Sequence, residues 1–236
     1  EDIIYAEGLS HDYWNSSNTT ALPLYMDSYV PENNSQNRPL LMLIHGGAFV
    51  GGSKQQDAIV DMANYYASRG FVVFSIDYRL RDHMGTIPQA WIDASSVGNP
   101  SNLDQIFAIY PAHRDAKAAL RWIMANAQNY NINKDYITVG GGSAGAITSI
   151  GICVSELDDY KDEISSSEDN TLSSTNLSQT YEVQTILDFW GSTESIEILE
   201  SIYGHQRFDS NDPALFIAHG TDCLLYTSDA ADEEDS

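Results

Sequence analysis

Short runs of apolar residues alternate along this chain with segments in which apolar residues recur every three or four positions. The clearest runs are residues 40–44, 71–76 and 136–139, each bounded by glycine, proline or polar residues. Near-continuous apolar strands separated by amphipathic helices are typical of a parallel sheet that helices cover on both faces. The pattern therefore predicts an α/β fold with a mostly parallel central sheet.

The helices between these runs can be placed from their spacing and their end signals. Between the first two runs, apolar side chains recur from Ile59 to Tyr66 at helical spacing. Asp57 stands where it can cap this helix, and Gly70 stands where it can end it. Further elements are expected as helices over residues 116–127 and 147–154, and as strands over residues 185–190 and 214–218, the last of them buried.

Two connections stand outside the alternation. Residues 81–111 form a long connection, and connections of that length usually carry function or are disordered. Residues 156–180 are rich in serine, asparagine and aspartate, which predicts a mobile surface excursion that could form part of a lid.

Composition and charge narrow the classes of partner. With 236 residues, 42% of them hydrophobic, the chain is long enough for one globular domain. Its formal net charge of −23 repels nucleic acid and anionic membranes, so neither is expected as a partner. No run of 18 apolar residues is present, which predicts no transmembrane segment.

The two cysteines, Cys153 and Cys223, do not support a disulfide framework. We expect neither a metal nor a cofactor. The oligomeric state and the compartment stay open, a secreted or periplasmic location being one alternative.

The stretch from Gly141 to Gly145 contains the pattern Gly-x-Ser-x-Gly. A predicted strand leads into it and an apolar helix leads out, so Ser143 would occupy the tight turn between them. The turn lifts the hydroxyl above the carboxyl end of the strand and onto the helix N-terminus. Free N–H groups and the helix dipole favour a developing oxyanion there.

A second glycine-rich stretch, HGGAF at residues 45–49, follows directly after the first apolar run. Its two glycines allow main-chain N–H groups to face a ligand, and open α/β sheets bind ligands at the carboxyl ends of their strands. Either stretch alone could be a glycine-rich turn. Because each stretch directly follows a predicted strand, and the two occur in this order, we expect them to form one shared site.

These stretches resemble the α/β-hydrolase fold, specifically its carboxylesterase- and lipase-like members with an HGG-type oxyanion loop. The resemblance covers residues 5–222. It rests on HGGAF at 45–49, IDYRL at 76–80, NKDYITVGGGSAGA at 133–146, DFWGS at 188–192 and ALFIAHGTD at 214–222.

The resemblance implies a serine hydrolase that cleaves small-molecule carboxylic esters through an acyl-enzyme. Ser143 would be the nucleophile, and the main-chain N–H groups of Gly46, Gly47 and Ala144 would form the oxyanion hole. An amidase or peptidase on the same fold remains an alternative, as does a non-catalytic binding domain with an esterase-like fold.

Tryptophans near these stretches are candidates for substrate binding. The connection over residues 81–111 opens at the carboxyl edge of the sheet, so we expect it to cover Ser143 with Trp91 as a wall of the pocket. Trp190 could line a pocket or pack in the core.

Other polar residues have structural interpretations. Asp77 and Arg79 are expected to hold the end of the sheet together through hydrogen bonds. His113 is expected to begin a helix as a surface or capping residue. His45 and His219 lie in the HG loops of the family's pattern, and the resemblance implies that both orient the backbone rather than catalyse.

The end of the chain departs from the family's pattern. There the catalytic acid follows the strand at 214–218 and the histidine comes later, yet Asp222 lies one place early and none of the six histidines follows it. Asp222 is therefore only a candidate acid, the last strand and helix are expected to be missing, and the chain as written is expected to be inactive. Residues 223–236 resemble a translated sequencing adapter. We accordingly expect residues 1–222 to be the domain and residues 223–236 a non-native, disordered acidic tail.

Overall fold

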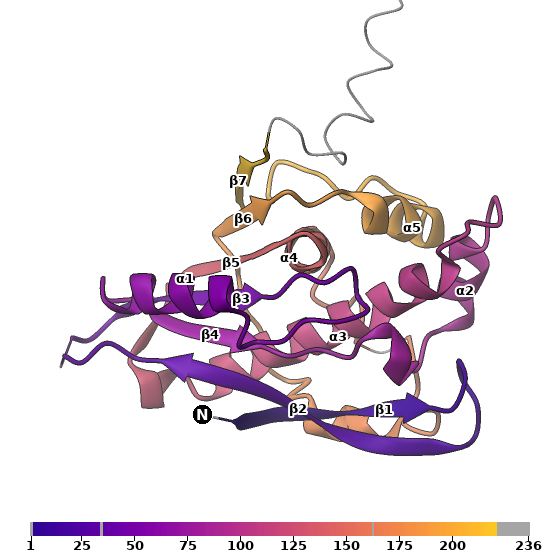
Figure 1. The fold of residues 1–236 in the computed structure, drawn as a ribbon, viewed down its shortest axis with the longest axis horizontal. Helices are drawn as coiled ribbons and strands as arrows, with labels where there is room; N and C mark the ends of the chain where they lie inside the picture. Colours follow the sequence, from indigo (N-terminus) through magenta and orange to yellow (C-terminus); the bar gives the residue numbers. More distant parts are fainter. Residues whose placement is uncertain (1, 34, 162, 221–236) are drawn as a thin grey trace, which may run out of the picture.

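A seven-stranded sheet runs through the described part of the chain, which is residues 2–33, 35–161 and 163–220 of a computed structural model (Figure 1). The expectations for Asp222 and for residues 223–236 lie outside these residues. Strand order is β1-β2-β4-β3-β5-β6-β7; β2 is antiparallel to both of its neighbours, and all other pairs are parallel. The strands are β1 (Ile3–His11), β2 (Thr19–Tyr29), β3 (Arg38–Ile44), β4 (Val72–Ile76), β5 (Ile132–Gly142), β6 (Thr185–Phe189) and β7 (Ala214–Ala218).

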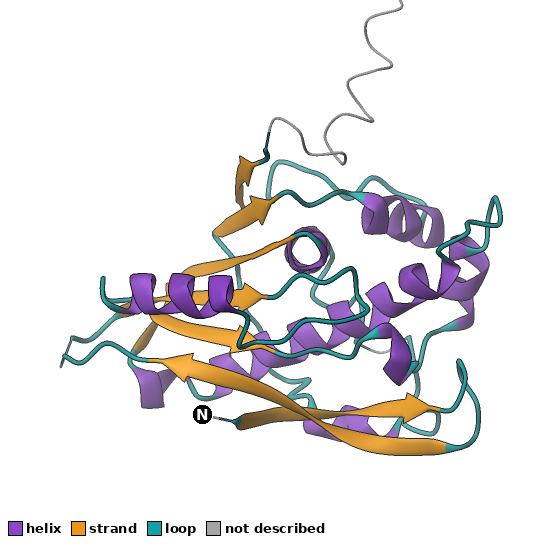
Figure 2. Cartoon of the chain, viewed as in Figure 1, coloured by secondary structure: helices purple, strands orange, loops and turns teal. Residues whose placement is uncertain are grey.

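Helices lie on both faces of this sheet (Figure 2). They are α1 (Asp57–Ala67), α2 (Gln89–Ser95), α3 (Leu103–Ala125), α4 (Ala144–Val154) and α5 (Glu194–Tyr203), with the 3-10 turns η1 (Arg81–His83), η2 (Ala127–Tyr130) and η3 (Asn170–Ser174). None of the helices in the described ranges combines the length and the apolar character that crossing a membrane requires.

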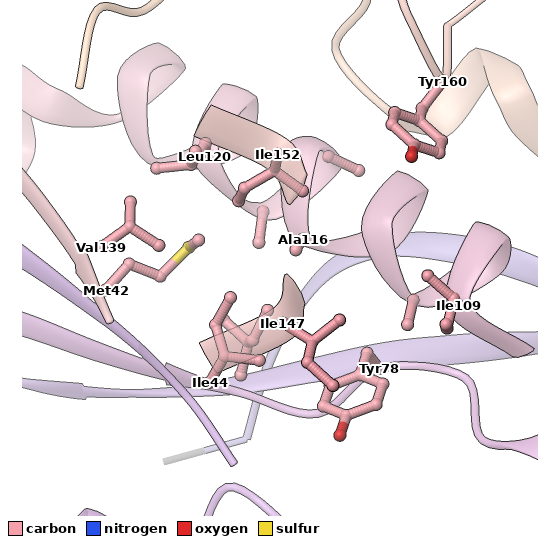
Figure 3. Close-up of a cluster of buried hydrophobic side chains, with 14 of the residues drawn as sticks. Met42, Ile44, Tyr78, Ile109, Ala116, Leu120, Val139, Ile147, Ile152 and Tyr160 are labelled. Atoms are coloured by element: carbon pink, nitrogen blue, oxygen red, sulfur yellow. The ribbon is translucent and has the colours of Figure 1, made fainter. Parts of the chain in front are cut away.

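Alternate side chains of β3 enter opposite cores. Leu41 packs with Ile59 and Ala63 of α1 on one face of the sheet. Met42 and Ile44 point to the other face, into the larger core that α3 and α4 complete (Figure 3). Because both faces are covered, β3 is apolar from Leu40 to Ile44, and the predicted α/β fold with a mostly parallel sheet is confirmed.

The N-terminal hairpin of β1 and β2 has no counterpart among the predicted elements. Its strands pair in antiparallel register from Ile3↔Met26 to His11↔Thr19. Polar and apolar residues mix along both strands, as in IIYAEGLSH, so no continuous apolar run marks them. An edge hairpin that is only half covered does not require such a run.

The strand predicted over residues 214–218 exists, but the expectation that it is buried is wrong. In the described part of the chain β7 pairs only with β6 and forms an edge of the sheet. Phe216 and Ile217 are 54% and 56% exposed. An apolar run shows that a strand can be buried, but it does not show which strand lies at an edge.

The connection predicted over residues 81–111 is largely helical. It contains η1, the whole of α2 and the first turns of α3, with Pro111 inside α3. Proline usually ends a helix, which explains the error. His113 consequently lies in the middle of α3 and is fully buried, so its expected surface or capping role is wrong.

The excursion over residues 156–180 is held against α3 by three cationic side chains. Arg114 pairs with Asp169 at 3.0 Å, Lys117 donates to the Asp159 carbonyl at 3.1 Å, and Arg121 donates to the carbonyl of Thr175 at 2.8 Å. Buried charges are stable only when they are paired and hydrogen-bonded, so these contacts fix the segment. The composition of residues 156–180 predicted mobility, but the three side chains that hold the segment belong to α3 and so could not be recognised from the segment's own sequence.

Arg79 and Asp115 form a buried ion pair between the end of β4 and α3. The Arg79 Nη2 lies 2.6 Å from Asp115 Oδ1, its Nε also donates to the carboxylate, and its Nη1 donates to the carbonyl of Leu9 in β1. Both side chains are almost completely buried. Tyr5 of β1 donates to the carbonyl of Asp77 at 2.7 Å. The predicted structural role of Asp77 and Arg79 is confirmed.

Replacing Arg79 by methionine leaves the Asp115 carboxylate buried without its counter-charge. We expect the free energy of unfolding to fall by about 3–5 kcal/mol, measured by urea denaturation. Arg81→Met is the matched control, because the Arg81–Asp82 pair is exposed and such pairs contribute only about 0–1 kcal/mol. Equal losses in the two variants would contradict this account of the buried pair.

His113 gives the fold a defined dependence on pH. Burial and the nearby Lys117 ammonium lower the pKa of His113 to about 3, while its Nδ1 lies 2.9 Å from the Tyr160 hydroxyl. In the unfolded chain an unperturbed histidine has a pKa of about 6.5. Between these two values only the unfolded state takes up the proton, so stability is full above pH 6.5 and declines as the pH falls.

The slope of unfolding free energy against pH tests this. From pH 6.5 to pH 4.5 we expect His113 to contribute a loss of about 1 kcal/mol per pH unit. His113→Gln cannot titrate, so its denaturation curves should show a shallower slope over this window. An unchanged slope would show that His113 is not held neutral by the fold.

Candidate functional site

Ser143 occupies a sharp turn between the end of β5 and the start of α4. Its backbone angles, φ 53° and ψ −122°, lie in a region that residues with a side chain rarely adopt. The Ser143 N–H donates to the carbonyl of Phe189 at 2.9 Å, which ties the turn to the end of β6. The predicted strand–turn–helix placement of Ser143 is confirmed.

Glycines on either side of Ser143 allow three backbones to meet. A Cβ on Gly141 would lie 2.3 Å from the carbonyl oxygen of Ile44, and a Cβ on Gly145 would lie 2.1 Å from the same oxygen. Since these distances are far inside van der Waals contact, any side chain at either position would push α4 away from β3. The two glycines therefore fix Ser143 above the carboxyl ends of β3 and β5.

The HGGAF loop lies directly against Ser143. A Cβ on Gly46 would lie 2.7 Å from the carbonyl oxygen of Gly142 and 3.4 Å from the Cβ of Ser143. Gly47 has φ 128°, which favours glycine. In the described residues neither Gly46 nor Gly47 donates its N–H to a backbone acceptor. Ala144 is the first residue of α4, where N–H groups have no partner within the helix.

Gly46 and Ala144 therefore lie directly beside Ser143, and Gly47 lines the same hollow as the serine. Main-chain donors of this kind stabilise an oxyanion when they are already in place before charge develops. The role of Gly46, Gly47 and Ala144 as an oxyanion hole stays a prediction, with a geometry that suits it.

His45 holds the loop rather than facing a substrate. It is 1% exposed, its ring stacks on Tyr78 at a centroid distance of 4.4 Å, and its Nδ1 lies 2.8 Å from the carbonyl oxygen of Gly46. The Tyr78 hydroxyl donates to the His45 carbonyl at 2.9 Å. Burial lowers the pKa of His45, so the ring is neutral and its Nδ1–H can donate to Gly46. These contacts confirm the expected orienting role.

Two hollows open on either side of Ser143, which lines both. The α1-side hollow has a volume of about 250 Å³ and the α3-side hollow about 160 Å³. The α1-side hollow is lined by Gly46, Gly47, Gln56, Ala58, Ile59, Met62, Gly141, Gly142, Phe189 and Trp190, and the α3-side hollow by Ala48, Phe49, Asn102, Gln105, Ile106, Ile109, Ala144, Ile147 and Ser192.

The two predicted tryptophans have different positions. Trp190 is 49% exposed and lies in the wall of the α1-side hollow, so its contact with substrate stays a prediction. Trp91 is completely buried and lines neither hollow, so the expectation that it forms a pocket wall is wrong. Its Nε1–H donates to the carbonyl of Ile106 at 3.2 Å and supports the α3-side hollow from behind. The 81–111 connection does reach Ser143, but through residues of α3.

Asp188 and His219 form a pair that the sequence interpretation missed. Asp188 Oδ1 accepts the Gly191 N–H at 2.7 Å, and its Oδ2 lies 3.6 Å from His219 Nε2. Both residues lie at the carboxyl ends of the neighbouring parallel strands β6 and β7. Their position in the motifs DFWGS and AHGTD, each at the end of a predicted strand, was the signal that could have indicated the pair. The pair joins the ends of β6 and β7.

A proton acceptor for Ser143 is not evident in the described ranges. Within those ranges the hydrogen bonds of the histidines go to groups other than the Ser143 hydroxyl. Asp222, the candidate acid, lies outside those ranges. The described residues also contain no group of three or more histidine, cysteine, aspartate or glutamate side chains that could hold a metal ion.

Comparison with known proteins gives one family. A model of the carboxylesterase family matches residues 23–187. The cocaine esterase of Homo sapiens is 32% identical over 136 residues, which cover 57% of this chain and 21% of that protein. The para-nitrobenzyl esterase of Bacillus subtilis is 30% identical over 129 residues, which cover 53% of this chain and 23% of that protein. The aligned region thus spans about a fifth of the length of these relatives.

Solved structures share the fold. The apo form of esterase 2 from Thermogutta terrifontis is 20% identical, with a TM-score of 0.60 over 98% of this chain and 76% of that chain. The same enzyme phosphoramylated by tabun is 19% identical, with a TM-score of 0.61 over 98% of this chain and 75% of that chain. At these identities the likeness shows the fold alone.

Gly145, two residues after Ser143, provides a direct test of the site's construction. A Gly145→Ala methyl group would press on the Ile44 carbonyl, so we expect urea denaturation to show a loss of at least about 2 kcal/mol of unfolding free energy. Gly51→Ala is the matched control, because a Cβ there meets nothing within 4 Å and should change stability by less than about 1 kcal/mol. Similar values for the two variants would mean that the close backbone contact is not required.

Proposed function

The chain belongs to the carboxylesterase family, and from that premise we propose that it carries the nucleophile and oxyanion hole of a serine hydrolase acting on carboxylic esters. The observation that carries the proposal is the position of Ser143 on its strained turn at the start of α4, directly against the glycine-rich loop that contains Gly46 and Gly47. The esterase names of the curated relatives support an ester as the substrate.

The proposed reaction has two halves. The Ser143 oxygen bonds to the acyl carbon while its proton passes to a general base, and the carbonyl oxygen becomes an oxyanion that the main-chain N–H groups stabilise. The bond from the acyl carbon to the alcohol oxygen then breaks, and the alcohol leaves with a proton. Water repeats the sequence on the acyl-enzyme and releases the carboxylic acid and free Ser143. The proposal assigns the general base to a group outside the described residues.

The hollows suit a small ester. Their walls are mainly apolar, and no charged residue lines either of them. An ester carbonyl at Ser143 would place its acyl and alcohol parts in the two hollows, away from water. An apolar wall does not separate an ester from an amide, so amide hydrolysis remains the second candidate.

The first experiment measures hydrolysis of p-nitrophenyl butyrate by the full-length protein, defined as residues 1–222 followed by the family's last strand, helix and catalytic histidine in place of residues 223–236. We expect Ser143→Ala to lower turnover by a factor on the order of 10⁶, toward the background rate, because the attacking oxygen is lost. Ser149→Ala is the control. Its hydroxyl is buried in the same helix and donates to the Gly145 carbonyl at 2.7 Å, and it lines neither hollow. Equal turnover by the native protein and Ser143→Ala would end the proposal.

A comparison of leaving groups separates the remaining alternatives. The proposal expects p-nitrophenyl butyrate to react faster than butyryl p-nitroanilide at equal concentration. A faster anilide reaction would indicate an amidase. Binding of both compounds without hydrolysis of either would indicate a non-catalytic binding domain.

A further inference from the structure

A third hollow lies between α2 and α5, which are side by side in the fold (Figure 1). This α2–α5 hollow has a volume of about 440 Å³, larger than either hollow at Ser143. Asn102 and Ile106 line both it and the α3-side hollow, so the two adjoin at these side chains. The other residues that line it are Ala94, Ser95, Val97, Pro100, Glu197, Ile198 and Ser201.

Glu197 distinguishes the α2–α5 hollow from the site at Ser143. It is the one charged residue lining any of the three hollows in the described part of the chain. Glu197 is exposed and belongs to a chain with a formal net charge of −23, so the field of the whole chain favours cations over anions there. A group that binds beside Glu197 is therefore favoured when it is positively charged and disfavoured when it is negatively charged.

Two serine hydroxyls along the same path have no hydrogen-bond partner within the described ranges. They are the buried Oγ atoms of Ser192, a residue that lines the α3-side hollow, and of Ser95, a residue that lines the α2–α5 hollow. Ser95 as a residue is 4% exposed. A buried hydroxyl without a partner costs free energy, and a ligand that supplies hydrogen bonds would recover it.

Together these features specify one kind of ligand. A purely apolar chain would leave the Ser95 hydroxyl unpaired and would desolvate Glu197, and an anion would be repelled. A primary ammonium group carries one positive charge and three N–H donors, so it can pair with the exposed Glu197 carboxylate and, when the Ser95 side chain rotates toward the hollow, donate to its hydroxyl. The aliphatic side chains of Ile106, Val97 and Ile198 suit the hydrocarbon that would connect such a group to the ester.

We propose that the α2–α5 hollow binds the far end of an extended substrate arm, a linear hydrocarbon chain that passes Ile106 and ends in a primary ammonium group. The inference rests on the proposed function, because the other end of the arm is the ester whose carbonyl lies at Ser143. It adds an aminoalkyl ester as the substrate class.

Binding can be measured without hydrolysis. Isothermal titration calorimetry of the full-length Ser143→Ala protein at pH 7 and about 0.15 M salt would use n-butyl-, n-hexyl-, n-octyl- and n-decylammonium. The alcohols and sulfates of the same chain lengths serve as comparison ligands. We expect the ammonium ions to bind more tightly than the alcohols once the chain is long enough to pass Ile106, and the sulfates to bind most weakly.

Two variants locate the effect. Glu197→Gln should weaken binding of the longer ammonium ions about threefold to fivefold and leave the alcohols unchanged, as expected for one partly exposed ion pair. Asp93→Asn removes one charge from an exposed position on α2 that lines none of the three hollows, and it should leave both unchanged. Ile106→Trp should block the path and weaken the longer ions selectively.

The outcomes are distinct from those of the hydrolysis test. Equal affinity for alcohols and ammonium ions, no detectable ammonium binding, or equal effects of Glu197→Gln and Asp93→Asn would overturn the inference even if Ser143 hydrolyses short esters. Conversely, Glu197-dependent binding that grows with chain length supports the hollow's specificity whether or not p-nitrophenyl butyrate is cleaved, so failure of the proposed function would be recognised separately.

Discussion

The close meeting of backbones at the carboxyl ends of β3 and β5 is the constraint on which the site depends. Gly141 and Gly145 both approach the carbonyl oxygen of Ile44, at distances that no side chain permits. This contact seats the N-terminus of α4 against the sheet and forces Ser143 into its strained turn. The HGGAF loop begins one residue after Ile44, so the same contact brings Gly46 against Ser143.

A second set of interactions holds the wall of the site in place. Residues 156–180 cover the cationic side chains of α3. Arg114 pairs with Asp169, and Lys117 donates to the main-chain carbonyl of Asp159. Removing one partner of such a buried set leaves a charge without compensation, so the set fixes the position of the whole helix. The N-terminal turns of the same helix supply Gln105 and Ile106 to the α3-side hollow, and Gln105 also donates to the Ala48 carbonyl at 3.2 Å.

The sequence predicted those features that depend on local pattern. Strands buried on both faces, and Ser143 between a strand and a helix, follow from residue order, because apolar runs and glycine turns are specified locally. It did not predict features that tertiary packing decides. Trp91 was expected to line a pocket but is buried behind one. His113 was expected at the surface but is buried beside Tyr160, and α3 continues through Pro111 where a helix end was expected. The Asp188–His219 pair joins two strands whose neighbourhood the linear sequence does not show.

The central claim is that this backbone constraint makes Ser143 a nucleophile, and the site of covalent attack tests it most directly. The full-length protein would be treated with a fluorophosphonate probe, digested, and the modified residue identified by tandem mass spectrometry. We expect one adduct per chain, on the peptide that contains Ser143, and none after prior unfolding in urea. A stoichiometric adduct on any other residue, or no adduct on the folded protein, would contradict the account.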